Sequence, residues 1–229
     1  MTPDQMQRDG RAGPLADASN GYEAVATDFL AGRGSGIGSA VGLRAVRQWV
    51  GTIKPGGTVL DLGCGPGYPM TKVLVDAGLT VYGVDASPRL VAAFRERFPG
   101  LPVECNAVER SDFFGREFDA VMAWGLLFLL PADAQELVID KAARVLTPGG
   151  QLVFTAPPSS CEWLDAMTGQ RSQSLGRDAY RRIIERAGLA LAGETEDEGK
   201  NHYYMTVKPQ RRAISSCLTQ LARRRVEAP

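Results

Sequence analysis

The chain has 229 residues, 44% of them hydrophobic, which suits one α/β domain with a sizeable core and is tight for two. Its 26 basic and 26 acidic residues cancel, so the basic excess typical of tight nucleic-acid binders is absent. The four cysteines lie far apart and there is only one histidine. This composition argues against a structural zinc site and favours free thiols in a reducing cytoplasm.

The sequence carries no sign of export or of a membrane span. Its first 19 residues lack the apolar core of a signal peptide. The longest strongly apolar run, residues 120–130, is too short to cross a bilayer. We therefore expect a cytoplasmic protein without a membrane partner.

The first part of the chain is predicted to be mainly helical. Residues 1–19 are rich in Asp, Gly and Pro, and we expect them to be disordered ahead of a single domain over 20–209. Apolar residues at helical spacing predict a helix over 21–30, with Asn20 as a possible cap. A Gly/Ser stretch follows, and then a second helix over 41–50.

From Thr58 onward, short apolar runs alternate with amphipathic stretches. The predicted strands are 58–62, 80–84, 102–105, 118–123 and 151–155. The predicted helices between them are 68–77, 88–98 and 132–146. This alternation predicts a mostly parallel sheet with helices on both faces and right-handed crossovers.

The alternation pauses after Thr155. Residues 157–175 show no clear periodicity, and we interpret them as an insertion or lid over the site. A helix over 176–187 and strands over 189–194 and 203–207 complete the predicted domain. Residues 210–229 form a basic C-terminal tail.

The most informative motif is Val59-Leu60-Asp61-Leu62-Gly63-Cys64-Gly65-Pro66-Gly67, a strand that runs into a glycine-rich turn before a helix. Glycines allow positive φ and let a ligand approach the backbone closely. A dinucleotide fingerprint would need its third glycine at position 68, which is Tyr68. The spacing therefore disfavours a pyrophosphate site.

This stretch resembles motif I of class I S-adenosylmethionine-dependent methyltransferases. The resemblance implies a three-layer α/β/α sandwich with a mostly parallel seven-stranded sheet and an antiparallel last strand. It also implies S-adenosylmethionine as cofactor, S-adenosylhomocysteine as product, and cofactor contacts from Asp61, Gly63, Cys64 and Gly65.

A second acidic position ends the second predicted strand, in Val84-Asp85-Ala86-Ser87. Asp85 can accept hydrogen bonds from both hydroxyls of a ribose, as acids do at this position of nucleotide-binding folds. Alternatively, its carboxylate is simply favoured near a helix N-terminus. Ser87 is suited to cap the next helix. The resemblance places Asp85, Ala86 and Ser87 beside the cofactor.

The resemblance extends over about residues 22–209. Residues 108–114 occupy the family's adenine-side loop, but Val108 stands where the family often has an acid. Val108 can instead pack on the adenine face, and Glu109 is either the contact to the adenine amino group or a solvated carboxylate.

Residues at the exit of the fourth strand, Trp124, Gly125 and Leu126, would flank the methionine end of the cofactor; a core position is the less favoured alternative for Trp124. The Asn/Asp-Pro-Pro-Tyr/Phe motif of similar enzymes that methylate DNA bases is missing here, which again argues against nucleic acid. We expect Asp119 to be structural and 144–150 to form the turn into the fifth strand.

Several other residues have two plausible roles. Tyr22 and Phe29 would cover the cofactor or form an ordinary packed helix face. Arg33 would pair with the cofactor's carboxylate or lie in solvent. Trp163 and Met167 are candidates for an acceptor pocket, and His202, near the sheet edge, is more suited to structure than to catalysis.

The resulting hypothesis is transfer of a methyl group to a small-molecule acceptor by in-line displacement, in a monomer or homodimer without a metal. The sequence assigns no catalytic base and does not identify the acceptor. Two alternatives stay open: a nicotinamide-dependent oxidoreductase, and a non-catalytic sensor that binds S-adenosylmethionine.

Overall fold

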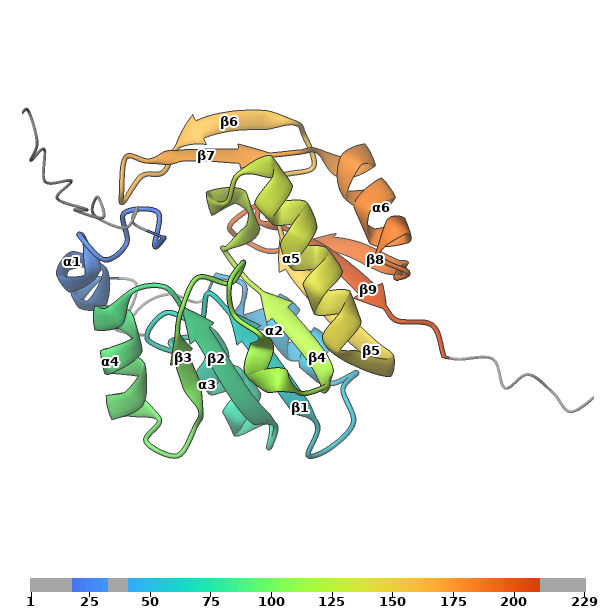
Figure 1. Cartoon of the computed structure of the whole chain (residues 1–229), viewed down its shortest axis with the longest axis horizontal. Helices are drawn as coiled ribbons and strands as arrows, with labels where there is room; N and C mark the ends of the chain where they lie inside the picture. Colours follow the sequence, from blue (N-terminus) through green and yellow to red (C-terminus); the bar gives the residue numbers. More distant parts are fainter. Residues whose placement is uncertain (1–17, 33–40, 211–229) are drawn as a thin grey trace, which may run out of the picture.

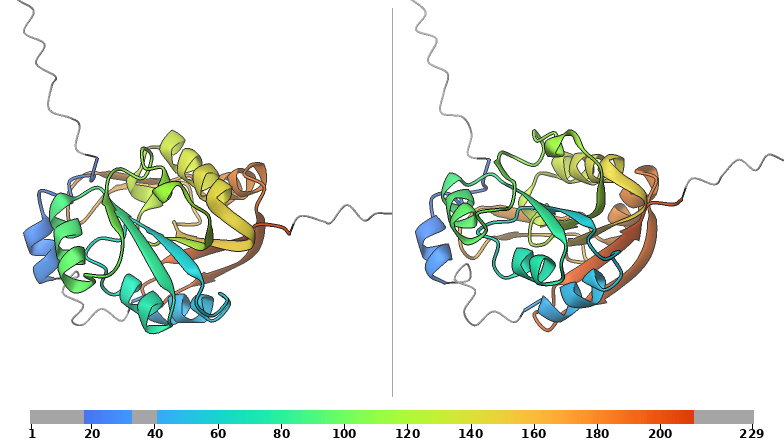
Figure 2. Two further views of the ribbon diagram at one scale, coloured as in Figure 1. Left: turned by 60° about the horizontal axis from the view of Figure 1, so that its bottom comes forward. Right: turned by 90° about the horizontal axis from the view of Figure 1, so that it is seen from below.

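A computed structural model describes residues 18–32 and 41–210, and within them a seven-stranded sheet lies between two layers of helices (Figures 1 and 2). The strands are β1 (Thr58–Leu62), β2 (Thr80–Asp85), β3 (Val103–Cys105), β4 (Phe118–Ala123), β5 (Leu146–Thr155), β8 (Ala190–Glu196) and β9 (His202–Val207). The helices are α1 (Ala26–Ala31), α2 (Leu43–Val50), α3 (Met70–Asp76), α4 (Pro88–Arg97), α5 (Ala132–Val145) and α6 (Arg177–Arg186). Short 3₁₀ turns occur at η2 (Phe113–Gly115) and η3 (Leu127–Leu129).

The strand order is β3-β2-β1-β4-β5-β9-β8, and β9 runs antiparallel to both of its neighbours. The predicted fold class is therefore confirmed. The order reverses between β1 and β4, which leaves a crevice at the carboxyl ends of these strands, where ligands bind in open α/β sheets.

Each face of the sheet has its own apolar core. Leu60, Val121 and Phe154 project toward the layer of α5 and α6, where Ile139 and Ile184 meet them. Alternate residues of the same strands project to the opposite face and pack against α2 and α3. Strand β1 is 0–2% exposed along most of its length, as a central parallel strand must be, because both of its faces are covered.

The largest departure from the sequence prediction is the segment 157–175. It forms an antiparallel hairpin, β6 (Cys161–Leu164) and β7 (Arg171–Ser174), rather than an irregular insertion. Figure 1 shows this hairpin running above the strand ends, with its turn on the side of α1. That this segment acts as a lid over the site stays a prediction.

Two predicted boundaries were wrong by five residues, and the others differ by two at most. The first helix begins at Ala26 and not at 21, because Asn20 and Gly21 have positive φ angles of 52° and 85°. Asn20 is therefore not its cap. Strand β5 starts at Leu146, five residues early, because Gly149 and Gly150 form backbone hydrogen bonds with Lys208. Residues 1–17 and 211–229, predicted as disorder and basic tail, lie outside the described residues.

Candidate active site

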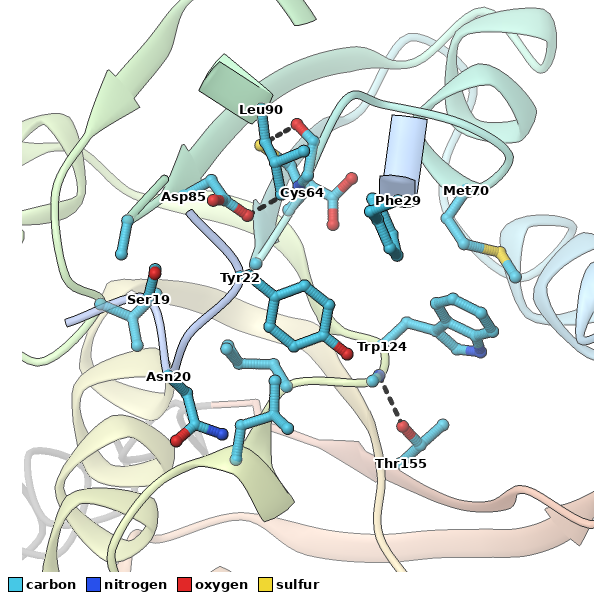
Figure 3. A pocket seen from close by; sticks show the side chains of 18 of the residues that line it. Ser19, Asn20, Tyr22, Phe29, Cys64, Met70, Asp85, Leu90, Trp124 and Thr155 are labelled. Atoms are coloured by element: carbon cyan, nitrogen blue, oxygen red, sulfur yellow. Dashed lines mark hydrogen bonds between the residues drawn. The ribbon is translucent and has the colours of Figure 1, made fainter. Parts of the chain in front are cut away.

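A cavity of about 360 Å³ lies at the carboxyl ends of β1, β2 and β4. Figure 3 shows the side chains of Tyr22, Asp85 and Trp124 around it. Of the 14 residues that the sequence predicts for the cofactor, 12 line this cavity: Tyr22, Asp61, Gly63, Cys64, Gly65, Asp85, Ala86, Val108, Glu109, Trp124, Gly125 and Leu126. Arg33 lies outside the described residues, and Ser87 lies outside the lining.

The three glycines of the turn after β1 serve two different purposes. All three have positive φ, from 53° to 81°. A Cβ on Gly67 would overlap the Phe98 ring, and one on Gly63 would lie 3.0 Å from Leu126 Cδ1. A Cβ on Gly65 would have only Phe29 Cε1 nearby, at 4.0 Å, and Gly65 lines the cavity. Gly65 therefore keeps backbone open to a ligand, whereas Gly63 and Gly67 permit packing.

Asp85 ties the glycine-rich turn to the end of β2. Its Oδ2 accepts a hydrogen bond from the Gly65 N–H at 2.8 Å and its Oδ1 accepts one from the Ser87 N–H at 2.9 Å. Burial raises the pKa of Asp85, and these two N–H donors oppose the rise. Each oxygen still has acceptor capacity, so Asp85 can hold the turn and a ligand hydroxyl together.

Asp61 is a second buried carboxylate in the cavity wall, 2% exposed. Its Oδ2 accepts a hydrogen bond of 2.6 Å from Thr71 Oγ1. Burial raises the pKa of Asp61 to about 7, against the Thr71 hydrogen bond and with a contribution from the nearby charge of Asp85. A cation beside Asp61 would offset this cost of burial.

The loop after β3 brings Val108 and Glu109 to the cavity, and α5 holds it in place. Lys141 Nζ donates hydrogen bonds to the carbonyl oxygens of Val108, Glu109 and Ser111, at 3.1, 2.8 and 2.6 Å. Val108 is 4% exposed. No sequence pattern indicates this role of Lys141, because its partners are backbone atoms 30 to 33 residues away.

Two polar atoms of the lining have no hydrogen-bond partner in the part of the chain that the structure describes. Asn20 Nδ2 and Glu109 Oε2 are buried and form no hydrogen bond within the described residues. Buried polar groups are nearly always satisfied, so an unpaired donor and an unpaired acceptor in one cavity wall indicate a ligand with complementary groups. An adenine ring carries both an amino donor and ring-nitrogen acceptors.

At the exit of β4, Trp124 is half-buried and lines the cavity, so it belongs neither wholly to the core nor to the surface. Its indole Nε1–H donates to Tyr203 Oη at 2.8 Å. The next residue, Gly125, donates its N–H to Thr155 Oγ1 at 2.8 Å. These bonds fix the exit of β4 against the ends of β5 and β9.

Residues distant in sequence complete the cavity on its other side. Tyr22 donates a hydrogen bond from its hydroxyl to Asp165 Oδ2 at 3.3 Å, which joins the N-terminal segment to the hairpin turn. Its ring packs edge-on against Phe29, with centroids 5.5 Å apart. Asn20, Asp165 and Asn201 line the cavity, although no local pattern in the sequence marks them.

The remaining candidates take structural positions. The Ser87 hydroxyl caps α4 by accepting from the Leu90 N–H at 3.2 Å, as predicted, and it donates to Glu23. Asp119 accepts from the Thr58 N–H at 2.9 Å and pairs with Lys54, which confirms its structural role.

The predicted acceptor-side residues and His202 lie outside the lining. The Trp163 ring packs at a tilt of 47° against Phe128, with centroids 5.4 Å apart, and Phe128 itself lines the cavity. Met167 donates its backbone N–H to Asp165. His202 is 5% exposed and its Nε2 lies 2.8 Å from Glu194 Oε2, in agreement with a structural role.

Comparison with known proteins agrees with the fold and the glycine-rich turn. Residues 59–150 match the family model of a methyltransferase domain. The chain is 35% identical over 113 residues to an uncharacterised methyltransferase of Synechocystis, covering 49% of this chain and 52% of that protein. It is 37% identical over 102 residues to a tRNA U34 carboxymethyltransferase of Cellvibrio japonicus, covering 42% of this chain and 31% of that protein. The chain thus spans about half, or less, of the length of these relatives.

Among solved structures, the chain resembles the 1,6-didemethyltoxoflavin-N1-methyltransferase of Burkholderia thailandensis, crystallised with its substrate and S-adenosylhomocysteine. The TM-score is 0.64 at 19% identity, and the match covers 87% of this chain and 93% of that one. Residues 59–150 are thus similar to a methyltransferase domain, and the chain shares the Rossmann-like fold of this solved structure.

Proposed function

We propose that this protein transfers a methyl group from S-adenosylmethionine to a small-molecule acceptor. The observation that carries the proposal is the convergence of Gly65, Asp85 and Glu109, from the ends of three neighbouring strands, on one cavity. S-adenosylmethionine supplies an electrophilic methyl group on a sulfonium, so the protein needs no nucleophile of its own.

In this proposal each part of the wall holds one part of the cofactor. Gly65 offers bare backbone, and the carboxylate of Asp85 accepts hydrogen bonds from the ribose hydroxyls. Val108 packs on the adenine, whose amino group donates to the unpaired Glu109 Oε2. Asp61 pairs with the ammonium of the methionine end, which favours the ionised form of its buried carboxylate.

The chain's contribution to the reaction is then positioning and exclusion of water. Trp124 and Leu126 hold the methyl end, and the wall formed by Tyr22 and Asp165 separates it from solvent. Holding two reactants in line can contribute up to roughly 7–11 kcal/mol to the rate in the best intramolecular models. No residue is assigned as a catalytic base.

We further propose a monomer or homodimer that acts in the cytoplasm and not on nucleic acid. The described cavity lining includes no Lys, Arg or His to contact a phosphate backbone. Within residues 18–32 and 41–210, every helix falls short of the length and hydrophobicity that a membrane crossing needs. Their three cysteines are free. In the same residues no group of three or more His, Cys, Asp and Glu is arranged to hold a metal.

Calorimetry with S-adenosylhomocysteine and with NADH tests the cofactor. We expect S-adenosylhomocysteine to bind and NADH not to bind. Asp85→Ala should weaken S-adenosylhomocysteine binding by ~1–3 kcal/mol, because charge-assisted hydrogen bonds are lost. Binding of NADH alone would favour the oxidoreductase alternative, and unchanged affinity in a folded Asp85→Ala protein would remove Asp85 from the site.

Transfer of a labelled methyl group into a library of small molecules tests the reaction itself. Turnover of at least one acceptor is the expected result. Tight binding of S-adenosylhomocysteine without turnover across a broad library would instead support the non-catalytic sensor.

A further inference from the structure

The part of the cavity not assigned to the cofactor is largely apolar and aromatic. Apart from the residues predicted to contact or cover the cofactor, its main lining side chains are Tyr68, Met70, Phe128, Leu129 and Leu130. Flat apolar walls of this kind bury an aromatic or aliphatic frame and gain from its removal from water. The frame of the acceptor is therefore expected to be apolar.

The charge of the cavity is one-sided. Its described lining includes four carboxylates, from Asp61, Asp85, Glu109 and Asp165, and no Lys, Arg or His. A phosphate or carboxylate on the acceptor would meet like charge with no compensating cation, which costs several kcal/mol at a desolvated interface. An ammonium group would meet opposite charge.

Asp165 differs from the other three carboxylates in where it comes from. Asp61 and Asp85 lie at the carboxyl ends of β1 and β2, and Glu109 lies in the loop after β3, whereas Asp165 lies in the turn between β6 and β7. It is thus the one acid of the described lining that the predicted cofactor contacts do not use. Its position on the hairpin places its charge apart from the glycine-rich turn.

The carboxylate of Asp165 is held in a fixed orientation. Its Oδ1 accepts hydrogen bonds from the Met167 N–H at 3.0 Å, the Thr168 N–H at 2.9 Å and Thr168 Oγ1 at 3.2 Å. Its Oδ2 accepts one long bond of 3.3 Å from Tyr22 and retains capacity for a further donor. A charge that is oriented before binding costs little ordering when a ligand arrives.

We propose that the acceptor is an amine on an apolar, preferably aromatic, frame, and that Asp165 selects it by pairing with its ammonium group. This inference rests on the proposed methyl transfer. The bound amine loses one proton to solvent, and its lone pair then forms the new N–C bond to the methyl carbon. The C–S bond breaks with its electron pair left on sulfur, and the methylated ammonium is the product.

Matched probes test the charge preference without knowledge of the natural acceptor. The protein is saturated with S-adenosylhomocysteine, whose binding is measured first, and is then titrated with tryptamine, 3-ethylindole and indole-3-propionate. These three share an indole frame and differ in charge. We expect tryptamine to bind at least about tenfold more tightly than indole-3-propionate, with 3-ethylindole between them.

Equal or tighter binding of the anion, or no millimolar binding of tryptamine, would overturn the inference. If S-adenosylhomocysteine itself fails to bind, the proposed function fails instead, so the two failures are distinguishable. The comparison needs only the unmodified protein and so does not depend on how any variant folds.

Asp165→Asn sharpens the assignment, because the amide oxygen can still accept the turn's hydrogen bonds while the charge is lost. We expect the ratio of tryptamine to indole-3-propionate affinity to fall about threefold or more, with S-adenosylhomocysteine affinity little changed. The control is Glu162→Gln in the same hairpin, an exposed acid paired with Arg171 and outside the cavity lining. A ratio that is unchanged in Asp165→Asn, or that falls equally in both variants, would remove Asp165 from recognition.

Discussion

The cavity has two walls that are built differently. The strand-end wall comprises residues 61, 63–66, 85–86, 108–109 and 124–126, and the covering wall comprises residues 18–20, Tyr22, Phe29 and Asp165. Backbone groups dominate the first: the N–H groups of Gly63 and Cys64 donate to the Val84 carbonyl oxygen, at 2.8 and 3.2 Å. These bonds belong to the sheet, so they open only when the sheet does.

The covering wall is held to the rest of the domain by side chains. Tyr22 reaches Asp165, and Glu23 contacts Ser87 and Arg89 at the start of α4. Such bonds contribute about 0.5–1.5 kcal/mol each, and less when exposed. The predicted cofactor contacts therefore lie mainly in the strand-end wall, which is the more stable of the two. Access to them depends on the covering wall, which only a few side-chain bonds hold in place.

The largest expected effect concerns Asp61, in the strand-end wall. Its folded-state pKa of about 7 lies above the unfolded value near 4, so its protonated form stabilises the empty protein below pH 4. That contribution, roughly 3–4 kcal/mol, is lost as the pH rises from about 4 through about 7. Urea unfolding across this range should show the decline, and Asp61→Asn should remove it while weakening S-adenosylhomocysteine binding.

Asp119 is a control, because its pKa is shifted in the opposite direction to that of Asp61. Burial opposes the shift, but the bonds from Lys54 and Thr58 prevail and lower the pKa of Asp119. Its contribution is therefore present at neutral pH and is lost on acidification. If the stability of Asp61→Asn depends on pH in the same way as that of the unmodified protein, the pH dependence does not come from Asp61.

The next effect separates two glycines of the same turn. Gly67→Ala combines a strained positive φ with overlap on the Phe98 ring, and should lower the free energy of unfolding by about 3 kcal/mol. Gly65→Ala faces the cavity and should cost about 1 kcal/mol of stability while reducing S-adenosylhomocysteine affinity much more. Unfolding curves measure the stability of both variants, and calorimetry measures their affinity for S-adenosylhomocysteine. A folded Gly65→Ala protein with full affinity would contradict the role given to the turn.

The contrast between the walls also explains what the sequence could predict. Asp61 and Gly65 belong to one strand–turn–helix motif, and Asp85 ends the next strand. The sequence motif therefore grouped these three residues, and all three line one cavity. Asp165 and Tyr22 meet across 143 residues, and no local pattern encodes such a pairing. The covering wall could therefore be predicted only in outline.

The hairpin escaped prediction for a related reason. Half-buried strands are recognised by alternating apolar residues, but β7 buries Ser172 and Ser174 instead. Ser174 satisfies its hydroxyl by donating to the Pro157 carbonyl oxygen at 2.6 Å. A strand whose inward residues are small and polar carries no hydrophobic period, so its register became evident only from the three-dimensional pairing.

A smaller effect is expected where a helix supports the strand-end wall. Lys141→Met keeps an apolar stem near the Phe113 ring but removes three charge-assisted hydrogen bonds to the loop of Val108 and Glu109. We expect S-adenosylhomocysteine affinity to fall about tenfold, or about 1.4 kcal/mol. Lys72→Met, which removes an exposed pair with Asp76, is the control. Equal affinities in the two variants would show that the loop needs no support from α5.

The smallest effect tests the covering wall. Tyr22→Phe removes the hydroxyl that donates to Asp165 and leaves the edge-on packing with Phe29, so global stability should fall by only about 0.5–1 kcal/mol. Because this bond links the two parts of the covering wall, hydrogen exchange should accelerate in residues 18–31 and 161–174 while the strands stay protected. Dissociation of S-adenosylhomocysteine should become a few-fold faster, because the same hydrogen bond is lost. Tyr82→Phe, which removes a hydroxyl paired with Arg116 outside the cavity, should change neither rate. Acceleration confined to residues 18–31 would mean that the two parts open independently, and that the bond between Tyr22 and Asp165 does not couple them.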